Sequence, residues 1–444
     1  MAGRSRRTEE TVAQETRTLV VGPYLSGRRL APEESSARSA GARFEEAVGL
    51  ARAIDLNVVG AELANLSEIR PATFIGKGKV EAIAQRVEET DAGLVVMDCA
   101  LSPVQQRNLE KAFSAKVIDR TGLILEIFGR RARTKEGALQ VELAHLAYQK
   151  SRLVRSWTHL ERQRGGFGFL GGPGETQIET DRRLIQERMI RIERDLEGVK
   201  KTRGLHRTSR RAVPYPTLAL VGYTNAGKST LFNRLTDAAV STRDMLFATL
   251  DPTMRALKLP HGSVAILSDT VGFISDLPTT LISAFRATLE EVLAADLILH
   301  VRDISHADTA AQSLDVAAIL GELGCQSPVI EVWNKLDKLD DDHRAGLLTN
   351  GAGAARNESF AVSALTGEGV EALLAAIETR LAQGRSIIEL DVDAGDGQGL
   401  HWLYENAEVM ARDTAENGAI RLKLRIAPEK LTRLARRFPG AAAT

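Results

Sequence analysis

The stretch Gly222-Tyr-Thr-Asn-Ala-Gly227-Lys228-Ser229 decides the fold of this 444-residue chain. It follows the apolar run Leu218–Val221 and opens a segment, Lys228–Leu235, that has the pattern of a helix. A glycine-rich loop that ends in Gly-Lys-Ser between a strand and a helix is typical of phosphate-binding loops. Backbone N–H groups of such a loop and of the helix N-terminus face phosphate oxygens. We therefore expect an α/β domain with a doubly wound sheet that binds a nucleotide.

Two side chains of this loop have specific predicted roles. Lys228 supplies a positive charge to the β- and γ-phosphates, and the Ser229 hydroxyl is placed to ligate Mg²⁺. The other expected phosphate contacts are Gly222, Tyr223, Thr224, Asn225, Ala226, Gly227 and Thr230.

Three further motifs follow in order, each at the end of an apolar run. Asp269-Thr270-Val271-Gly272 offers a carboxylate for Mg²⁺ and the Gly272 amide for the γ-phosphate. In Asn334-Lys335-Leu336-Asp337, the last carboxylate can accept from N1–H and the exocyclic amine of guanine, a donor pair that adenine lacks. Ser363-Ala364-Leu365 offers the Ala364 amide to guanine O6. Together the four motifs predict that the chain binds GTP and GDP with Mg²⁺.

A switch segment is expected between the first two motifs, at Phe247-Ala248-Thr249-Leu250-Asp251-Pro252. A segment that closes on the γ-phosphate and Mg²⁺ needs a hydroxyl or carbonyl, and we predict Thr249, with Thr253 as the alternative. The predicted catalytic residues are Lys228, Thr249 and Gly272, and the predicted metal ligands are Ser229, Thr249 and Asp269. We also predict nucleotide contacts by the neighbouring residues Phe247, Ala248, Leu250 and Asp251.

The residue after Asp-x-x-Gly is Phe273, where Ras-like GTPases commonly place a Gln that orients the attacking water. Because Phe cannot orient water, we expect slow basal hydrolysis that a bound partner accelerates. Phe273 can also simply pack under the switch.

The pattern of apolar runs divides the rest of the chain. The expected parts are a disordered N-terminus (1–16), an N-terminal α/β domain (17–130), a basic helical hairpin (131–211) with a Gly-rich tip (165–174), the GTPase domain (212–384) and a small C-terminal α/β domain (385–444). Expected strands are Leu19–Val21, Val58–Val59, Leu94–Met97, Val117–Ile118, Leu218–Val221, Val264–Leu267, Leu297–Val301, Val329–Trp333 and Phe360–Val362. Expected helices include Phe44–Ile54, Lys79–Glu89 and Pro103–Ala112, and Ile387–Phe438 has the pattern strand–helix–strand–helix.

Two heptad patterns predict the hairpin. Apolar residues recur in steps of three and four from Leu139 to Leu160 and again from Ile178 to Val199, which indicates two long helices with narrow seams. We expect them to pack antiparallel, with Thr176 and Glu179 forming a capping box at the start of the second. At the Gly-rich tip, Phe167 and Phe169 either probe a partner or fold back onto the helices.

Charge is distributed unevenly along a chain whose 58 Lys and Arg balance 58 Asp and Glu. Residues 120–211 hold 21 Lys and Arg but 11 Asp and Glu, a net charge of +10, so the remainder carries −10. Such segregation favours contact with a polyanion over a merely solvated helix face. Two cysteines, no apolar run long enough for a membrane span and no secretory signal predict a cytoplasmic protein without integral membrane association.

The chain resembles the HflX family of translation-factor-class GTPases from about Thr18 to Phe438. The similarity rests on Phe74-Ile-Gly-Lys-Gly-Lys79, Leu101-Ser-Pro-Val-Gln-Gln-Arg-Asn-Leu-Glu-Lys111, Val117-Ile-Asp-Arg-Thr-Gly-Leu-Ile-Leu125, Gly172-Pro-Gly-Glu-Thr-Gln-Ile-Glu-Thr-Asp-Arg-Arg183, Phe247-Ala-Thr-Leu-Asp-Pro252 and Asp269-Thr-Val-Gly-Phe273. The resemblance implies a protein, expected to be a monomer, that binds the large ribosomal subunit through ribosomal RNA. It also implies ribosome-stimulated GTP hydrolysis, splitting of stalled or idle ribosomes under stress, and a hairpin tip that reaches toward the peptidyl-transferase centre. For the N-terminal domain it suggests ATP binding, with Gly76–Lys79 as the candidate residues.

Two other functions remain open from the sequence. The chain could be a regulatory module in which GTP occupancy gates a protein partner, with the hairpin as a coiled-coil interface. It could also be an RNA-remodelling NTPase, which Asn334 and Asp337 at the guanine-reading positions disfavour. Salt dependence separates RNA contact, which weakens steeply with salt, from a seam-driven protein interface.

Overall fold

The fold was obtained as a computed structural model that describes most of the 444 residues. Its described backbone comprises residues 16–25, 38–163, 173–211, 215–236, 246–247, 249, 253–275, 286–340, 344, 359–383, 386–414, 418–426, 428–439 and 442–443. The chain divides into two compact units. The first contains residues 1–194, 244–247 and 276–284, and the second contains residues 195–243, 248–275 and 285–444.

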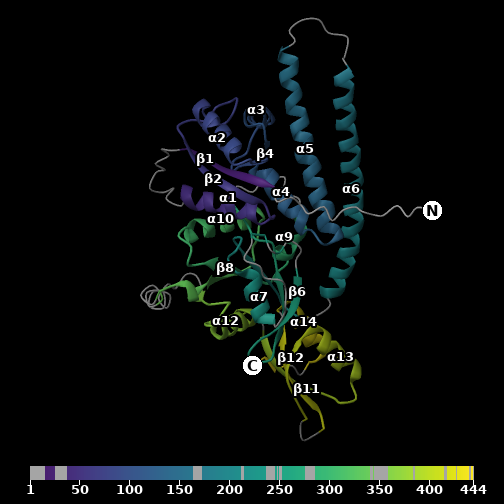
Figure 1. The fold of residues 1–444 in the computed structure, drawn as a ribbon. Helices are drawn as coiled ribbons and strands as arrows, with labels where there is room; N and C mark the ends of the chain where they lie inside the picture. Colours follow the sequence, from purple (N-terminus) through teal and green to yellow (C-terminus); the bar gives the residue numbers. More distant parts are fainter. Residues whose placement is uncertain are drawn as a thin grey trace, which may run out of the picture. The chain divides into compact units, whose positions relative to one another are not determined.

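A four-stranded parallel sheet forms the centre of the first unit (Figure 1). Its order is β2 (Asn57–Leu66), β1 (Arg17–Leu25), β3 (Leu94–Met97) and β4 (Lys116–Asp119). The helices are α1 (Ala40–Arg52), α2 (Lys77–Glu89), α3 (Pro103–Phe113) and α4 (Arg120–Arg131). This confirms the expected strands and the largely parallel sheet. Helix α4 was not expected; it begins directly after β4, where the Asp119 side chain accepts a hydrogen bond from Gly122 N (2.9 Å) and caps it.

Two long helices follow, α5 (Lys135–Gln163) and α6 (Pro173–Arg211). Lys150 of α5 hydrogen-bonds Gln186 of α6, and Glu142 pairs with Arg188 at 2.8 Å, so the helices run antiparallel as expected. The prediction that α6 begins at a Thr176 capping box was wrong. The helix begins one turn earlier at Pro173, because proline fits the first helical position, where its missing N–H costs nothing.

The hairpin tip carries expectations that the structure does not address. Residues 164–172 lie outside the described residues, as do the side chains of 154–178. Both interpretations of Phe167 and Phe169 therefore stay predictions, and so does the disordered character of residues 1–15.

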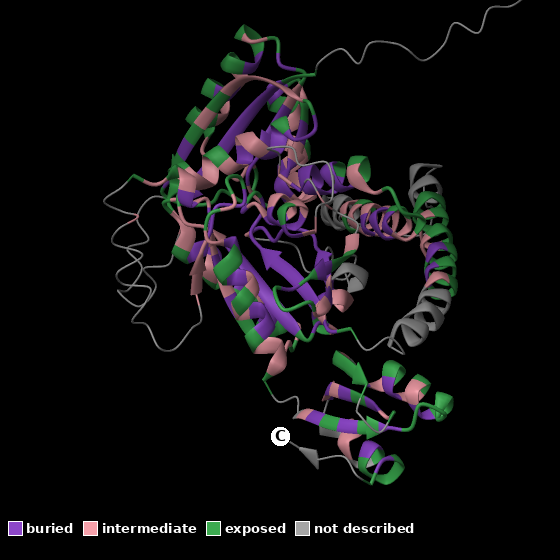
Figure 2. Cartoon of the chain, turned by 90° about the horizontal axis from the view of Figure 1, so that it is seen from below, coloured by how far each residue is buried: buried purple, intermediate pink, exposed green. Residues whose placement is uncertain are grey.

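The second unit holds a six-stranded sheet in the order β10-β9-β8-β5-β7-β6. Its strands are β5 (Thr217–Gly222), β6 (Thr253–Lys258), β7 (Val264–Asp269), β8 (Leu297–Asp303), β9 (Val329–Asn334) and β10 (Ser359–Ala361). Named helices are α7 (Lys228–Thr236), α9 (Arg286–Leu293), α10 (Thr309–Glu322), a 3₁₀ turn η2 (Leu336–Lys338) and α12 (Val370–Ala382). Five strands are parallel, and only the unforeseen edge strand β6 is antiparallel. The sheet is doubly wound, as predicted, and Figure 2 shows its buried strands beneath less buried helices.

The C-terminal part of the second unit corrects the expected strand–helix–strand–helix pattern. Its elements are β11 (Ser386–Val392), α13 (Gly397–Asn406), β12 (Glu408–Thr414), β13 (Ile420–Ile426), α14 (Pro428–Arg437) and β14 (Ala442–Ala443). They form an antiparallel sheet in the order β12-β13-β11-β14. The first strand after α13 was missed because only one face of the β12–β13 pair reaches the core, and β12 is a polar edge strand. Across the described residues, no helix has the length and apolar character needed to cross a membrane.

Candidate GTP site

The phosphate-binding loop lies between the end of β5 at Gly222 and the start of α7 at Lys228. Gly227 has φ +93°, and a Cβ atom there would lie 2.2 Å from Asn334 Nδ2. Glycine is therefore required at this point, where the first and third motifs touch. Asn225 adopts a left-handed conformation with φ +60°, which asparagine tolerates better than most residues.

Lys228 is a buried cation at the centre of this loop. Its Nζ donates hydrogen bonds to the carbonyls of Gly222 (3.1 Å) and Tyr223 (2.8 Å). Burial lowers the pKa of Lys228 to about 8, although Asp269 opposes this shift. A cation held by neutral carbonyls in a dry site is suited to an incoming phosphate oxygen.

Three oxygen-bearing side chains converge beside Lys228. The Ser229 and Thr249 hydroxyls lie 2.7 Å apart, and they donate to Asp269 Oδ2 over 2.7 and 2.9 Å respectively. Asp269 Oδ1 is buried and has no hydrogen-bond partner among the described residues. Burial raises the pKa of the Asp269 carboxyl, while the two hydroxyls and Lys228 oppose that rise. The group therefore gains from a cation that would replace the water it has lost.

These residues fit a magnesium ion. Hydroxyl and carboxylate oxygens are the protein ligands that Mg²⁺ prefers, together with substrate phosphates. The structure brings together the three predicted metal ligands, and it favours Thr249 over the alternative Thr253, which begins β6 and pairs with Asp269 through the backbone ladder. Among the described residues no group of three or more His, Cys, Asp and Glu forms another candidate metal site.

The two motifs that are predicted to contact guanine meet next to the phosphate loop. Asn334 Nδ2 donates to Ala226 O and its Oδ1 accepts from Ala364 N, both over 2.9 Å. Ser363 Oγ donates to Asp337 Oδ1 over 2.6 Å, which orients that carboxylate. The structure thus joins the third and fourth motifs to the phosphate loop through Asn334.

Two residues of this region were missed by the sequence reasoning. Arg234 of α7 donates to Ala364 O (3.2 Å) and to Leu365 O, and so supports the loop that carries the Ala364 amide. Asp303 at the end of β8 pairs with Lys335 Nζ at 2.7 Å, which holds the left-handed Lys335 (φ +70°). Asp303 lies two residues beyond the predicted strand Leu297–Val301, so its position was a usable signal, whereas nothing local marks Arg234.

The segment after Asp-x-x-Gly is joined to the phosphate loop by its backbone. Thr224 N donates to Phe273 O (2.8 Å), and Phe273 N donates to Gly222 O (3.1 Å). A Cβ atom on Gly272 would lie 3.0 Å from Lys228 Nζ, so the Gly272 backbone closely approaches the phosphate-binding cation. Phe273 is buried, whereas the Tyr223 hydroxyl, Ser275 and Asp315 form a hydrogen-bonded chain beside it.

The structure places the remaining predicted nucleotide contacts as follows. Thr270 Oγ1 donates to Leu220 O (2.5 Å), Val271 is buried, Thr230 lies in the first turn of α7 and Leu365 is exposed. Ala248, Leu250 and Asp251 lie outside the described residues. Phe247 belongs to the first unit, where its ring contacts Phe128. Their roles as nucleotide contacts stay predictions.

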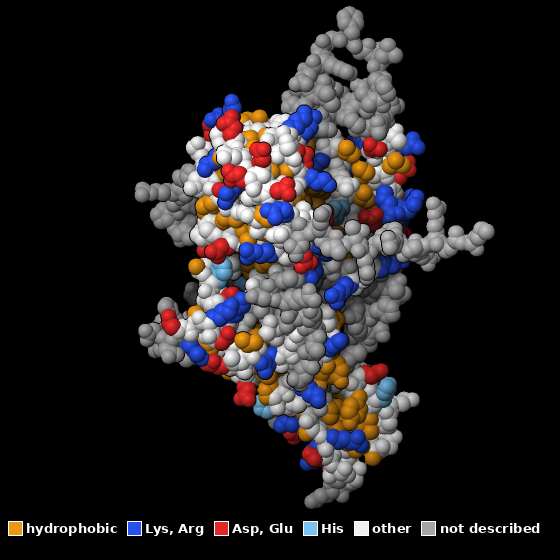
Figure 3. Space-filling model, viewed as in Figure 1, with side chains coloured by type: hydrophobic (Ala, Val, Ile, Leu, Met, Phe, Trp, Pro, Cys, Tyr) orange, Lys and Arg blue, Asp and Glu red, His pale blue; other side chains and the backbone are white. Residues whose placement is uncertain are grey.

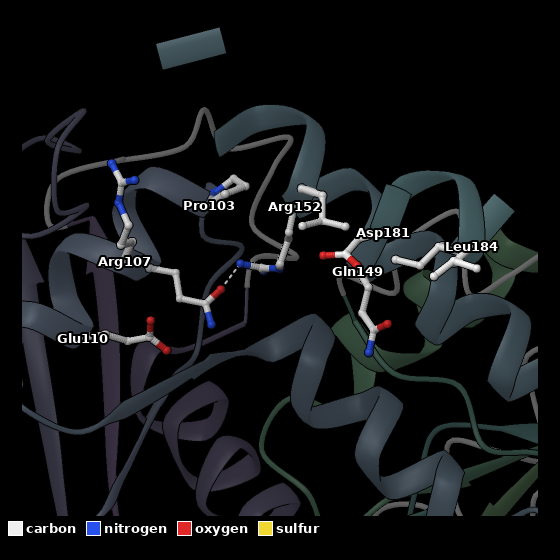
Figure 4. A pocket seen from close by; sticks show the side chains of 10 residues that line it. Pro103, Arg107, Glu110, Gln149, Arg152, Asp181 and Leu184 are labelled. Carbon is white, nitrogen blue, oxygen red and sulfur yellow. Dashed lines mark hydrogen bonds between the residues drawn. The ribbon is translucent and has the colours of Figure 1, made fainter. Parts of the chain in front are cut away.

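The first unit has a separate cavity of about 650 Å³, between α3 and the two long helices (Figure 4). Charged residues of both signs line it, among them Arg107, Glu110, Arg152 and Asp181. The Arg152 guanidinium is already engaged by Gln106 and by Asp119. At the other candidate of this unit, Gly76–Lys79, Gly76 is the N-cap of α2 and Lys77 is exposed beside Glu81. ATP binding at Gly76–Lys79 therefore stays a prediction.

The fold is that of a P-loop GTPase. Its mostly parallel sheet carries a glycine-rich loop ending in Gly227-Lys228-Ser229 after β5, Asp269 at the end of β7 and the Asn-Lys-x-Asp motif at the end of β9. A family model described as 50S ribosome-binding GTPase matches residues 217–335. Models described as GTP-binding GTPase N-terminal and GTP-binding GTPase Middle Region match residues 41–129 and 131–210, and one described as HflX C-terminal domain matches 348–443.

Characterised relatives extend over nearly the whole chain. The GTPase HflX of Magnetococcus marinus is 51% identical over 394 residues, covering 88% of this chain and 89% of that protein. The GTPase HflX of Escherichia coli is 44% identical over 371 residues, covering 83% and 86%. The chain therefore belongs to the HflX family of GTPases, enzymes that hydrolyse GTP.

Among solved structures, a GTP-binding protein from Sulfolobus solfataricus in complex with GDP is similar. It is 22% identical with a TM-score of 0.42, and the match covers 83% of this chain and 99% of that one.

Proposed function

We propose that this GTPase binds the large ribosomal subunit in its GTP state and dissociates or rescues stalled or idle ribosomes under stress. The observation that carries the proposal is the match of residues 217–335 to a family described as 50S ribosome-binding GTPases. The net charge of +10 on residues 120–211 supports ribosomal RNA as the surface that the arm (131–211) contacts. We propose that the protein acts as a monomer in the cytoplasm.

The residues of the site have distinct roles in this proposal. Lys228 and the loop amides hold the β- and γ-phosphates, and the Gly272 amide contacts the γ-phosphate. Ser229, Thr249 and Asp269 hold Mg²⁺, which when bound neutralises charge on the phosphates. Asp337 selects guanine, and Asn334 keeps its strand end in register with the phosphate loop. Catalysis is positioning and electrostatic stabilisation of phosphoryl transfer to water.

Slow basal hydrolysis follows from the position of Phe273. The ring is buried and carries no polar atom, so it cannot orient the attacking water. Ser275, two residues further on, is already committed to Tyr223 and Asp315. A partner that supplies or frees a polar group is then the source of faster hydrolysis, and we propose that the ribosome is this partner.

The arm presents its surplus cations on exposed positions. Arg191 and Arg194 of α6 are exposed, whereas Arg183 is paired with Glu187 and Arg188 with Glu142. On the face shown in Figure 3, blue and red side chains are interspersed over the described residues of both units. The net positive charge of the arm therefore comes from particular exposed positions and not from a continuous basic patch on that face.

Co-sedimentation with isolated ribosomal subunits tests the proposal. With a non-hydrolysable GTP analogue, the protein should pellet with the large subunit, and with GDP much less. Affinity should fall steeply with the logarithm of the salt concentration. Absence from the large subunit in both nucleotide states would contradict the proposal.

Charge-reversal variants locate the contact. The double variant Arg191→Glu/Arg194→Glu on the arm should weaken binding and reduce the salt slope. The matched control Arg255→Glu/Lys258→Glu changes two exposed cations of β6 by the same charge and should leave binding nearly unchanged. Binding that ignores salt and both variants would favour the regulatory module with a protein partner. Hydrolysis of ATP as fast as GTP would favour the RNA-remodelling NTPase.

A further inference from the structure

The side chain of Tyr223 joins the phosphate loop to the segment that follows Asp-x-x-Gly. Tyr223 is the second residue of the loop and is 4% exposed, and its backbone carbonyl accepts a hydrogen bond from Lys228 Nζ over 2.8 Å. Its hydroxyl lies 2.8 Å from Ser275 Oγ and accepts from Ser275 N over 2.9 Å. All three residues belong to the second unit. One residue therefore contacts the phosphate-binding cation through its backbone and Ser275 through its side chain.

The hydrogen bonds around Ser275 have one consistent direction. Ser275 Oγ donates to Asp315 Oδ2 of α10 over 2.6 Å, so its single proton is not available to Tyr223. The Tyr223 hydroxyl therefore donates to Ser275 Oγ while it accepts from Ser275 N. These bonds end on a carboxylate, and hydrogen bonds to a charged group are stronger than those between neutral groups. We call Tyr223, Ser275 and Asp315 the Tyr223 network.

This network adjoins the backbone that is proposed to contact the γ-phosphate. The N–H and the carbonyl of Phe273 both hydrogen-bond to backbone groups of the loop, over 3.1 and 2.8 Å. Gly272 is so close to the loop that a Cβ atom there would lie 2.9 Å from Thr224 Cα and 3.0 Å from Lys228 Nζ. Backbone bonds at Phe273 and side-chain bonds from Tyr223 thus hold the segment 272–275 against the loop, which restricts the Gly272 amide.

The next residue of the loop, Thr224, has a hydroxyl that is suited to a phosphate. The residue is 6% exposed, and its Oγ1 is buried without a hydrogen-bond partner among the described residues. Buried polar side-chain atoms in folded proteins usually have a partner. Thr224 Cγ2 lies 2.9 Å from the Cβ position of Gly272, so this side chain borders the same small region as the Gly272 backbone and Lys228 Nζ. These groups suit the oxygens of a γ-phosphate.

We propose that Tyr223 is a positioning residue that sets how well the site distinguishes GTP from GDP. Its hydroxyl, acting through Ser275 and Asp315, holds the Gly272 amide ready for the γ-phosphate. An amide that is held in place before the nucleotide binds loses less conformational freedom on binding, which raises affinity. GDP has no γ-phosphate, so its binding does not use this amide. The inference rests on the role proposed above for Gly272 and does not involve the ribosome.

The test compares the affinities of the full chain for a fluorescent non-hydrolysable GTP analogue and for fluorescent GDP, both with Mg²⁺. Tyr223→Phe keeps the ring and removes the hydroxyl, so it should weaken analogue binding by about fivefold and GDP binding by less than about twofold. Ser275→Ala should have the same effect, and the double variant should be no weaker than the weaker single variant, because both changes break one network. Asp315→Asn, which keeps an acceptor oxygen, should retain most of the analogue affinity that Asp315→Ala loses.

Tyr24→Phe is the matched control. Tyr24 is a buried tyrosine of the first unit whose hydroxyl donates to the Asp98 carboxylate, so the variant also loses a buried hydrogen bond. It should lower the melting temperature and leave the ratio of the two nucleotide affinities unchanged. A wild-type ratio in folded Tyr223→Phe protein would overturn the proposal, as would an equal change of the ratio in Tyr24→Phe.

Gly272→Ala separates this inference from the role on which it rests. The added methyl group would lie against Thr224 Cα, so the backbone of residue 272 has to move. If Gly272→Ala protein that binds GDP keeps the wild-type ratio, the γ-phosphate role of Gly272 is wrong. If Gly272→Ala weakens the analogue selectively and Tyr223→Phe does not, that role stands and only the positioning by Tyr223 is refuted.

Discussion

In both the parallel sheet of the first unit and the mostly parallel sheet of the second, carboxylates lie at the carboxyl ends of strands. Their hydrogen-bond partners differ. In the first unit, Asp98 and Asp119 follow β3 and end β4, and in the second unit Asp269 ends β7. Asp98 is bound by Arg120 (2.6 Å) and Tyr24 (2.5 Å), so its charge is satisfied within the protein. Asp269 accepts from the Ser229 and Thr249 hydroxyls on Oδ2, and no cation of the described residues is hydrogen-bonded to it.

The difference shows what makes a sheet edge into a binding site. Ligands bind at the carboxyl ends of strands in open α/β sheets, yet only an edge with unmatched charge attracts one. Burial disfavours the charge on Arg120, but Asp98 and Glu46 outweigh it and raise the pKa of that guanidinium. At the other edge, burial prevails and the Lys228 pKa falls to about 8. Arg120 completes a network with carboxylates of its own unit, whereas Lys228 is left as a buried cation that a phosphate group can pair with.

The largest effect is expected from removing Arg120, the cation that pairs with Asp98 and Glu46 in the first unit. Arg120→Met should destabilise the first unit by about 3 kcal/mol, because it leaves Asp98 and Glu46 buried without their shared cation. Urea unfolding of the full chain measures this change. Arg86→Met removes two exposed ion pairs of the same unit, to Glu62 and Glu89, and should cost less than about 0.5 kcal/mol. Equal losses in the two variants would mean that the network adds nothing to the stability.

Removing the Lys228 cation should impair nucleotide binding and leave stability intact, the opposite of what is expected for Arg120→Met. Lys228→Met should weaken GDP and GTP binding by on the order of 100-fold or more, because charge-assisted contacts to the phosphates are lost. The nucleotide-free protein should unfold at the same or a higher urea concentration, since a desolvated charge is gone. Titration with a fluorescent nucleotide and urea unfolding are the measurements. Lys338→Met, an exposed control in η2, should change neither.

The carboxylate that selects the base gives a change of specificity. Asp337→Asn replaces one acceptor of the guanine N–H pair by a donor, so GTP affinity should fall on the order of 100-fold. Xanthosine triphosphate, which has a carbonyl in place of the exocyclic amine, should gain affinity. Competition binding measures both. Asp340→Asn, a nearby exposed substitution, should leave the preference for guanine intact; a similar loss there would mean the effect is merely electrostatic.

The smallest expected effect concerns acid stability of the second unit. Burial lowers the pKa of His300 in β8 to about 4, from its usual 6.5. The unfolded chain then binds the extra proton between pH 6.5 and 4, so the free energy of unfolding falls as the pH drops through that window. His300→Gln should flatten this dependence in thermal melts across that range. His401→Gln, an exposed control, should retain the wild-type slope.

Features encoded by short contiguous patterns were predictable from the sequence. The apolar run Leu94–Met97 is β3 itself, and Ser102-Pro103 begins α3 with a complete capping box to Gln105. The phosphate loop, Asp269 and Asn334 all lie where strands end, as their motifs require. The family resemblance likewise rested on contiguous stretches, such as Leu101–Lys111 and Asp269–Phe273.

Features that depend on long-range contacts were not predictable. Strand β6 exposes residues on both faces, so no alternation marks it, and it exists because it pairs with β7. Arg234 contacts the Ala364 loop across 130 residues, which no local pattern reports. The seating of Phe247 on Phe128 likewise joins two segments that have no common motif. Helix α4 was not predicted for a different reason: its N-cap Asp119 is also the last residue of β4, so no loop separates the two elements.

Asp119 gives the arm a mechanical attachment. One oxygen of this carboxylate accepts from Tyr148 Oη (2.6 Å) and from Gly122 N (2.9 Å), and the other accepts from Arg152 (2.5 Å) and Leu101 N (3.2 Å). Tyr148 and Arg152 are one turn apart on α5, and Gly122 is in the first turn of α4. A force that pulls on the arm is thus passed, together with the Arg152–Gln106 contact to α3, to a side chain at the N-terminus of α4.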